Sequence, residues 1–270
     1  MSGRLVATLQ DLSGRRALVT GGAGHLGQAI SETLVELGAS VAVLDGNVGA
    51  CRRRAASLAR SARRARVVAV PCDLANESAT RRAVREAAGR LGGLDILIHA
   101  AGYVGSTPLA GWSVPFAQQS VKAWDAAVRV NVTAAFLLVQ EARRFLSASG
   151  HGSVVLINSI YGLVGPDLRL YAGTRMTNPI AYGVSKGGLL QLTRYLATLL
   201  APNVRVNSVS PGGVLRGQPA TFRRRYADRT PLRRMATEED IKGAIAYLAS
   251  DLSSYVTGHN LVVDGGWTAW

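Results

Sequence analysis

The chain is short of several residue types, and each shortage argues against a class of protein. Its 270 residues include two cysteines, Cys51 and Cys72, and neither stands beside other candidate metal ligands. The four histidines, at positions 25, 99, 151 and 259, are scattered, so we expect no metal site. No apolar run approaches the roughly 18 residues of a membrane span. The first residues lack the apolar core of a signal peptide, so we expect a cytoplasmic protein with no membrane partner.

Acidic residues are also scarce, with 17 Asp and Glu against 31 Lys and Arg, which gives a net charge of +14. Such an excess raises the possibility of nucleic-acid binding. Basic runs stand at residues 52–54, 63–64 and 223–225, but aromatic residues make up only 6% of the chain and none interleaves with these runs. Without aromatic side chains to stack on bases, the runs are better explained as solvated faces. We expect no specific nucleic-acid partner.

Apolar strand patterns alternate with helical patterns along the chain. Strands are expected at 16–20, 40–44, 66–71, 95–98, 153–158, 205–209 and 260–263. Helices are expected at 25–37, 50–62, 77–91, 121–147, 180–200 and 238–249. Strands joined by single helices form right-handed βαβ units on a parallel sheet. The prediction is one α/β domain over residues 1–270, with a doubly wound, Rossmann-type parallel sheet of about seven strands and helices on both faces.

Two stretches break this alternation, residues 160–180 and 212–235. Each follows the carboxyl end of a predicted strand, which is the ligand side of such sheets. Long irregular segments there are usually binding loops or lids, so both are candidate substrate loops.

A glycine turn follows the first predicted strand. Gly22, Gly24 and Gly27 match the G-x-G-x-x-G pattern of dinucleotide binding, and a helix begins immediately afterwards. Glycines let the backbone approach a pyrophosphate, and a helix N-terminus offers unpaired N–H donors. Asp45 ends the next strand, 18 residues after Gly27, where a carboxylate can accept hydrogen bonds from ribose hydroxyls and repel a 2′-phosphate. We therefore expect NAD, with NADP disfavoured.

Tyr182 and Lys186 stand four residues apart at the start of a predicted helix, so they share one helical face. A nearby cation favours the phenolate and lowers the pKa of a tyrosine, which would make Tyr182 a proton-transfer group. Ser159 ends a strand at the same sheet edge, and Asn131 is a polar residue among apolar neighbours in a helix. A buried amide there needs hydrogen-bond partners.

In this combination, and over residues 14–267, the chain resembles the classical branch of the short-chain dehydrogenase/reductase family. The resemblance implies that Tyr182 is the acid/base, that Lys186 lowers its pKa and holds the nicotinamide ribose, and that Ser159 polarises the carbonyl. It implies that Asn131 fixes a water that connects Lys186 to solvent. The implied cofactor contacts are Gly21, Gly24, His25, Leu26, Asp45, Asp73, Leu74, Ala100, Gly102, Tyr182, Lys186, Pro211, Gly212 and Val214.

Three features depart from the family pattern. His25 stands where the family usually has glycine, a spacing more typical of the extended branch. His99 and Ala100 replace a pair of asparagines. Residues 165–179 lengthen the stretch between Ser159 and Tyr182, which enlarges the expected wall of the substrate pocket.

Candidate substrate contacts in and near this insertion are Tyr161, Arg169, Tyr171 and Arg175. Because guanidinium groups bind carboxylates and phosphates with two bonds, several arginines suggest an anionic or heavily hydroxylated substrate. The expected reaction interconverts a secondary alcohol and a ketone, on a polyol, sugar derivative or hydroxy acid. Two alternatives stay open: an isomerase or lyase of the same fold that retains its cofactor, and a cofactor-binding regulator without turnover.

The long apolar helices at 121–147 and 180–200 could pair across a two-fold axis. The C-terminal Trp267 and Trp270 are large apolar residues that often bury against a neighbour or cover a pocket. We expect a homo-oligomer, a tetramer or otherwise a dimer.

Overall fold

A computed structural model describes residues 3–62 and 65–270, so the predicted basic run at 63–64 lies outside the described residues. Seven parallel strands form one sheet in the order β3-β2-β1-β4-β5-β6-β7. Their bounds are β1 Arg16–Thr20, β2 Ser40–Asp45, β3 Val67–Pro71, β4 Ile96–His99, β5 Gly152–Ile157, β6 Val204–Pro211 and β7 Asn260–Val263. The predicted fold class, a doubly wound α/β sheet, is confirmed.

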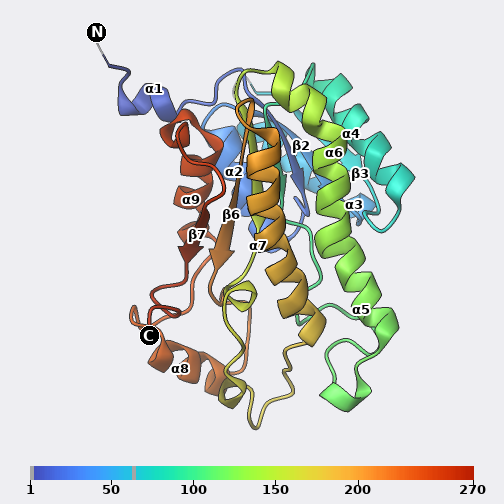
Figure 1. The fold of residues 1–270 in the computed structure, drawn as a ribbon, viewed down its shortest axis with the longest axis vertical. Helices are drawn as coiled ribbons and strands as arrows, with labels where there is room; N and C mark the ends of the chain where they lie inside the picture. The colour runs from blue at the N-terminus through green and yellow to red at the C-terminus, as the bar shows by residue number, and fades with distance from the viewer. Residues whose placement is uncertain (1–2, 63–64) are drawn as a thin grey trace.

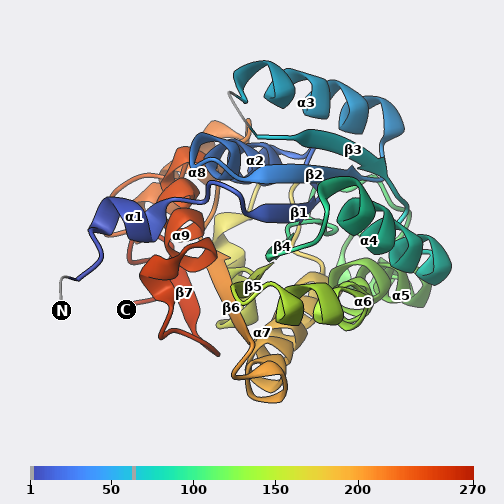
Figure 2. The ribbon, with the colours of Figure 1, turned by 90° about the horizontal axis from the view of Figure 1, so that it is seen from above.

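Helices cover both faces of this sheet (Figures 1 and 2). They are α1 Val6–Gln10, α2 His25–Glu36, α3 Val48–Ser61, α4 Glu77–Leu91, α5 Val121–Val128, α6 Ala134–Ala148, α7 Ile180–Leu200, α8 Ala220–Arg229 and α9 Glu239–Ala249. One core packs α4, α6 and α7 against the sheet, and the other packs α2, α3 and α9 against it. The central strands are buried on both faces, which explains why their sequences are apolar without alternation.

The structure differs from the predicted elements at three places. The helix expected at 121–147 is interrupted by a π-helical turn, η2, at Arg129–Thr133 between α5 and α6. The stretch expected to be irregular at 212–235 contains α8, whose Phe222 and Tyr226 are buried one turn apart on the same face. The five-residue helix α1 was not expected, and none of its residues is buried.

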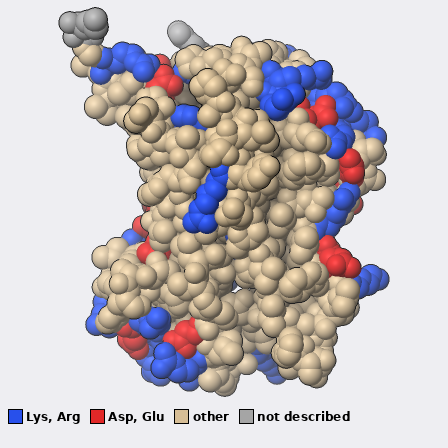
Figure 3. Space-filling view, in the orientation of Figure 1, with Lys and Arg blue, Asp and Glu red and all other residues tan. Residues whose placement is uncertain are grey.

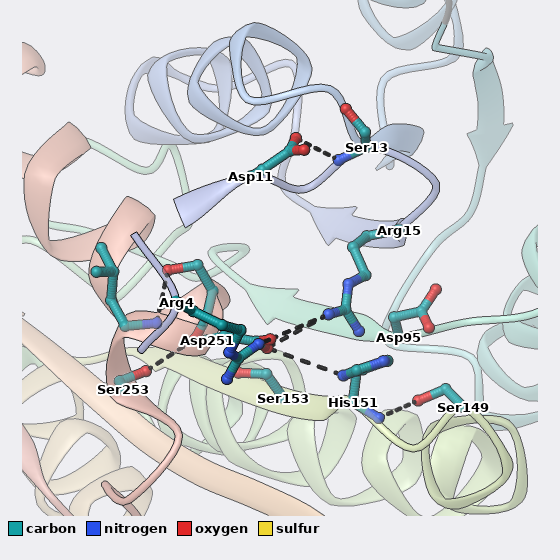
Figure 4. A network of polar contacts seen from close by, with 12 residues as sticks. Arg4, Asp11, Ser13, Arg15, Asp95, Ser149, His151, Ser153, Asp251 and Ser253 are labelled. Carbon is teal, nitrogen blue, oxygen red and sulfur yellow. Dashed lines mark hydrogen bonds and ion pairs between the residues drawn. The ribbon is translucent and has the colours of Figure 1, made fainter. Parts of the chain in front are cut away.

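The two edges of the sheet differ in what they carry. The carboxyl ends of the strands point toward α8 and the irregular segments (Figure 1). At the opposite edge, Asp251 accepts hydrogen bonds from Arg4 at 2.7 Å and Arg15 at 3.3 Å, with the His151 ring 3.8 Å away (Figure 4). This network connects the N-terminal segment to the short helix after α9. The edge of the sheet at the amino ends of the strands therefore has a structural role.

Charge is distributed unevenly over the surface. On the face shown in Figure 3, Lys and Arg gather at the margins, whereas the middle, over α7, is mostly uncharged. Within the part of the chain that the structure describes, no helix is long and apolar enough to cross a bilayer. No group of three or more His, Cys, Asp or Glu that could hold a metal ion occurs among those residues either. Cys51 and Cys72 are both free and buried.

Candidate active site

The glycine turn between β1 and α2 leaves no room for side chains. Gly21 has a φ of +64°, and a Cβ on it would lie 2.7 Å from the Cα of Ala101. A Cβ on Gly27 would overlap the carbonyl oxygen of Gly21. Real Cβ atoms do not approach other atoms so closely, so this turn requires glycine for both its conformation and its packing.

The N-terminus of α2 is open to a ligand. Gly24 is its N-cap residue, so no side chain accepts a hydrogen bond from the first-turn N–H groups. Asp45, at the end of β2, accepts hydrogen bonds from the Ala23 N–H at 3.1 Å and the Asn47 N–H at 2.9 Å. A carboxylate has further lone pairs, which leaves capacity for ribose hydroxyls. The turn, the helix end and the carboxylate together fit a dinucleotide.

The His25 side chain extends out of the turn and is 68% exposed. Its Nδ1 lies 3.7 Å from Oε1 of Glu238, just before α9, and the same oxygen lies 3.5 Å from Nε of Arg216. Glu238 thus links the start of α2 to the loop after β6. Sequence reasoning missed Glu238, because nothing in its local pattern indicates this contact.

The remaining cofactor candidates lie along the same edge. Asp73 is exposed and accepts a hydrogen bond from the Ala75 N–H at 2.9 Å, whereas Leu74 is buried. The Ala100 N–H donates to the Thr20 carbonyl at 3.2 Å. His99, beneath Ala100, is fully buried with its Nδ1 2.9 Å from the Thr20 hydroxyl. Burial lowers the pKa of His99 to about 3, so the ring is neutral.

The π-helical turn η2 places Asn131 against the centre of the site. Its Oδ1 accepts a hydrogen bond from the Tyr103 N–H at 2.7 Å, and its Nδ2 donates to the Ser185 hydroxyl at 2.9 Å. A Cβ on Gly102 would lie 3.1 Å from Asn131 Oδ1 and 3.6 Å from Lys186 Nζ. The amide and the ammonium group therefore flank Gly102, and a side chain there would crowd the Asn131 amide.

Lys186 is held below Tyr182 on α7. Its Nζ donates a hydrogen bond to the Ile157 carbonyl at 2.8 Å and lies 5.8 Å from the centre of the Tyr182 ring. The lysine is 5% exposed, and burial lowers its pKa to about 8. A buried ammonium this close to the phenol favours the phenolate only while it remains charged.

The pKa of Tyr182 differs from the sequence expectation. Burial raises it above its ordinary value, and this effect exceeds the lowering by the Ser159 hydroxyl and by the charge of Arg216. The expected lowering by Lys186 is not seen, because desolvation of the phenolate dominates. Ser159 is 6% exposed and also accepts a hydrogen bond from the Tyr161 N–H at 3.2 Å. Tyr182 is thus a neutral phenol in this structure.

A pocket of about 500 Å³ opens above Tyr182 and Ser159. Predicted site residues that line it are Leu26, Ser159, Tyr161, Tyr171, Arg175, Tyr182, Pro211, Gly212 and Val214. Arg169 is not among its lining residues; its guanidinium is 85% exposed and pairs with Asp167 at 2.8 Å. Lining residues that were not singled out as site residues include Asn158, Ser106, Ser113, Met176, Phe222 and Met235. Asn158 could have been identified from its position next to Ser159.

Aromatic side chains build the outer wall of this pocket. Tyr171 packs edge-on against Phe222 of α8 with ring centres 5.3 Å apart, and Trp267 stacks on Tyr226 at 6.1 Å. The Tyr161 and Tyr171 hydroxyls lie 3.0 Å apart. The C-terminal Trp267 is therefore buried within one chain, against the pocket wall, whereas Trp270 is 69% exposed.

Comparison with known proteins gives a consistent family. A family model described as enoyl-(acyl carrier protein) reductase matches residues 21–268. The cis-4-hydroxycyclohexanecarboxylate dehydrogenase of Sinomonas cyclohexanicum is 36% identical over 94% of this chain and 97% of its own length. The ribulose-forming D-arabinitol 2-dehydrogenase of Scheffersomyces stipitis is 32% identical over 96% of this chain and 95% of its own.

A solved structure agrees with these relatives. A short-chain type dehydrogenase/reductase from Mycobacterium marinum superposes with a TM-score of 0.86 at 31% identity, covering 99% of this chain and all of that one. The chain therefore belongs to the classical short-chain dehydrogenase/reductase family and is an oxidoreductase of alcohols and ketones that uses a nicotinamide cofactor.

Proposed function

We propose that the protein is an NAD(H)-dependent dehydrogenase/ketoreductase that interconverts a secondary alcohol and a ketone, with Tyr182 as the acid/base. The observation that carries this proposal is the placement of Tyr182 between Ser159 and the buried Lys186 on one side of the pocket. A phenol in that position can exchange a proton with an oxygen atom of a bound substrate.

Tyr182 and Ser159 are proposed to act on the substrate oxygen, and Asn131 and Lys186 on the path of the proton. A nicotinamide cofactor, which Tyr182 and Lys186 would hold at its ribose, would supply the hydride chemistry. In reduction, the neutral phenol of Tyr182 donates its proton to the carbonyl oxygen, and the Ser159 hydroxyl donates a hydrogen bond to that oxygen. In oxidation, the phenolate takes the proton of the alcohol, so oxidation should require a higher pH than reduction, because burial raises the pKa of Tyr182. Asn131 and Lys186 are proposed to return the proton to solvent.

The proposed cofactor contacts begin at the glycine turn and Asp45. The Asp45 carboxylate is proposed to favour NAD over NADP. The open N-terminus of α2 supports pyrophosphate binding there, and the Asp45 carboxylate supports binding of an unphosphorylated ribose. Asp73, Leu74, Ala100 and Gly102 continue the proposed contact surface toward the nicotinamide end.

The proposed substrate is a polyol, a sugar derivative or a hydroxy acid. Support comes from the two relatives, one named for a hydroxycyclohexanecarboxylate and one for a pentitol. Tyr161, Tyr171 and Arg175 are the proposed contacts, because all three line the pocket. The alternatives, an isomerase or lyase that returns the cofactor unchanged and a regulator without turnover, predict no net change in NADH.

We also propose a homotetramer, with a dimer as its minimal unit. This proposal is supported by the mostly uncharged face over α7 (Figure 3) and by the exposed apolar side chains of that helix, Ile180, Val184, Tyr195 and Leu199. Sedimentation of a single 28.4 kDa species at micromolar concentration would contradict it. The cytoplasmic location predicted from the sequence stays a prediction.

The test is absorbance at 340 nm with NAD or NADP and a panel of polyols, sugars and hydroxy acids that includes cis-4-hydroxycyclohexanecarboxylate. We expect NADH to form with one substrate class and NADPH to form much more slowly. Binding of NADH without turnover on any member of the panel would shift the assignment to the regulator.

A further inference from the structure

The charge of the pocket is one-sided. Its lining includes two arginines, Arg175 and Arg216, and no aspartate or glutamate. A polyol presents hydroxyl donors and is well served by carboxylate acceptors, which this lining does not provide. A guanidinium, by contrast, is suited to a carboxylate that it can bind with two parallel hydrogen bonds. The composition of the wall therefore favours an anionic substrate.

The two arginines differ in what already holds them. Arg216 pairs with Glu238, and its charge also lowers the pKa of Tyr182, so it lies toward the reacting centre. Arg175 is an exposed residue of the segment before α7 and, within residues 3–62 and 65–270, forms no ion pair. Within these described residues, a side-chain carboxylate binds Arg216 but none binds Arg175. The Arg175 guanidinium can therefore donate its hydrogen bonds to a ligand.

One side of the pocket that Arg175 lines is apolar. Met176 follows it directly, and Phe222, Tyr226 and Met235 line the same pocket as part of one buried apolar cluster. Apolar walls of this kind bind carbon atoms that carry few hydroxyl groups. A substrate that fills this space would place a small apolar frame between Tyr182 and the pocket rim.

We propose that Arg175 is the carboxylate-binding residue of the substrate pocket and that the substrate is a hydroxy or keto acid whose carboxylate is remote from the reacting carbon. This inference rests on the proposed alcohol/ketone oxidoreductase function and narrows its substrate class. The carboxylate binds the Arg175 guanidinium at the rim, while the carbonyl oxygen meets Tyr182 and Ser159. Arg175 takes no part in the proton transfer, so its contribution is to binding and orientation.

The experiment compares 4-oxocyclohexanecarboxylate with its uncharged carboxamide as substrates for NADH oxidation. In the wild-type enzyme we expect kcat/KM to be roughly 10- to 100-fold higher for the acid, the range of a hydrogen bond to a charged group. In Arg175→Gln that ratio should fall to near one, chiefly through KM. In Arg175→Lys it should fall only partly, because the positive charge remains but the pair of parallel N–H donors is lost.

Two control variants separate this role from general charge effects. Arg169→Gln removes a nearby guanidinium that does not line the pocket, so the acid-to-amide ratio should stay at its wild-type value. Arg216→Gln removes the arginine that lies toward Tyr182, so it should slow the acid and the amide alike.

The outcomes are distinguishable. Equal kcat/KM for the acid and the amide in the wild type would overturn the inference and leave the oxidoreductase function standing. A preference for the acid that survives Arg175→Gln would overturn the assignment to Arg175. Turnover of neither compound, with NADH bound, would count against both the inference and the proposed function.

Discussion

The segment from β1 to β4, which carries most of the cofactor candidates, and the wall that encloses the substrate pocket are built by different means. In the first, the chain backbone makes the glycine turn and the helix end: Gly21 and Gly27 have no space for a Cβ, and Gly24 leaves the helix end open, with the Asp45 side chain added at the end of β2. In the wall, residues 160–180 and 212–235, side chains make it: Tyr171 packs on Phe222, and Arg225 donates hydrogen bonds to the carbonyl groups of Arg169 and Leu170.

This difference explains which part can vary. A backbone-made site restricts the residue type at each position, so a substitution there removes the site. A side-chain-made wall depends only on complementary packing between two segments, so it can change its shape and charge while the sheet remains intact. We therefore expect the type of reaction to depend on the cofactor segment together with Asn131, Ser159, Tyr182 and Lys186, and the choice of substrate to depend on the wall.

The largest expected effect on activity is at Tyr182, which lies between the cofactor segment and the wall of the substrate pocket. Tyr182→Phe removes the proton donor but keeps the ring that packs above Lys186, so kcat should fall by ~10³-fold with little change in NADH affinity. Steady-state kinetics and quenching of tryptophan fluorescence by NADH measure the two quantities. A kcat within a few-fold of the wild type would remove Tyr182 from the acid/base role.

The cofactor segment should tolerate no added methyl group at the turn. Gly27→Ala places a Cβ where the Gly21 carbonyl oxygen now lies, so NADH affinity should fall by about 100-fold or more, with a lower Tm. The matched control is Gly89→Ala in α4, where a Cβ would meet nothing within 4 Å. This control should raise stability by about 0.5–1 kcal/mol. Unchanged NADH binding in Gly27→Ala would contradict the backbone-made site.

The nucleotide preference should depend on one carboxylate. Asp45→Ser removes the negative charge but keeps a hydrogen-bond acceptor near the Ala23 N–H. The ratio of kcat/KM for NAD to that for NADP should fall by roughly 10- to 100-fold, because repulsion of a 2′-phosphate is lost. A ratio unchanged by the substitution would mean that Asp45 does not face the adenosine ribose.

A smaller effect is expected on stability at acid pH, at the buried ring of His99. Its pKa of about 3 lies below the ordinary value of 6.5, so between these values the unfolded chain binds a proton that the folded chain does not. Stability is therefore lost as pH falls below 6.5, by at most about 1.4 kcal/mol per pH unit from this group.

His99→Asn should accordingly reduce the loss of stability between pH 7 and pH 5 by up to ~2 kcal/mol, measured by urea unfolding at each pH. His259→Asn, at an exposed position, is the control and should leave the loss as it is in the wild type. The same pH dependence in His99→Asn and the wild type would show that the ring accepts a proton inside the fold.

The sequence predicted the sheet well because strands buried on both faces leave an unmistakable apolar signature. All seven strands and the glycine turn could be located from local pattern alone. Helix α8 could not, because Arg223, Arg224 and Arg225 hide the spacing of Phe222 and Tyr226, whose burial depends on Trp267 and the 160–180 segment. The break at Asn131 was also missed, since a π-helical turn has no marker in residue type.

Within the candidate site, the residues that local pattern could find were those with a restricted type. Tyr182 and Ser159 line one pocket, and Lys186 lies close to the Tyr182 ring, whereas the roles predicted for these residues stay a prediction. The raised pKa of Tyr182 could not be predicted, because desolvation depends on how the whole pocket closes around the phenol. The outward pairing of Arg169 with Asp167 likewise depends on the conformation of one loop.

The most direct test of the proposed hydride transfer is the stoichiometry of the reaction with a ketone substrate and NADH. The NADH is deuterated at C4 on the face from which the hydride is transferred. We predict that one NADH is consumed for each alcohol formed, with deuterium on the carbinol carbon of the product. Product formed without net loss of NADH would contradict the proposed dehydrogenase function and indicate an isomerase or lyase.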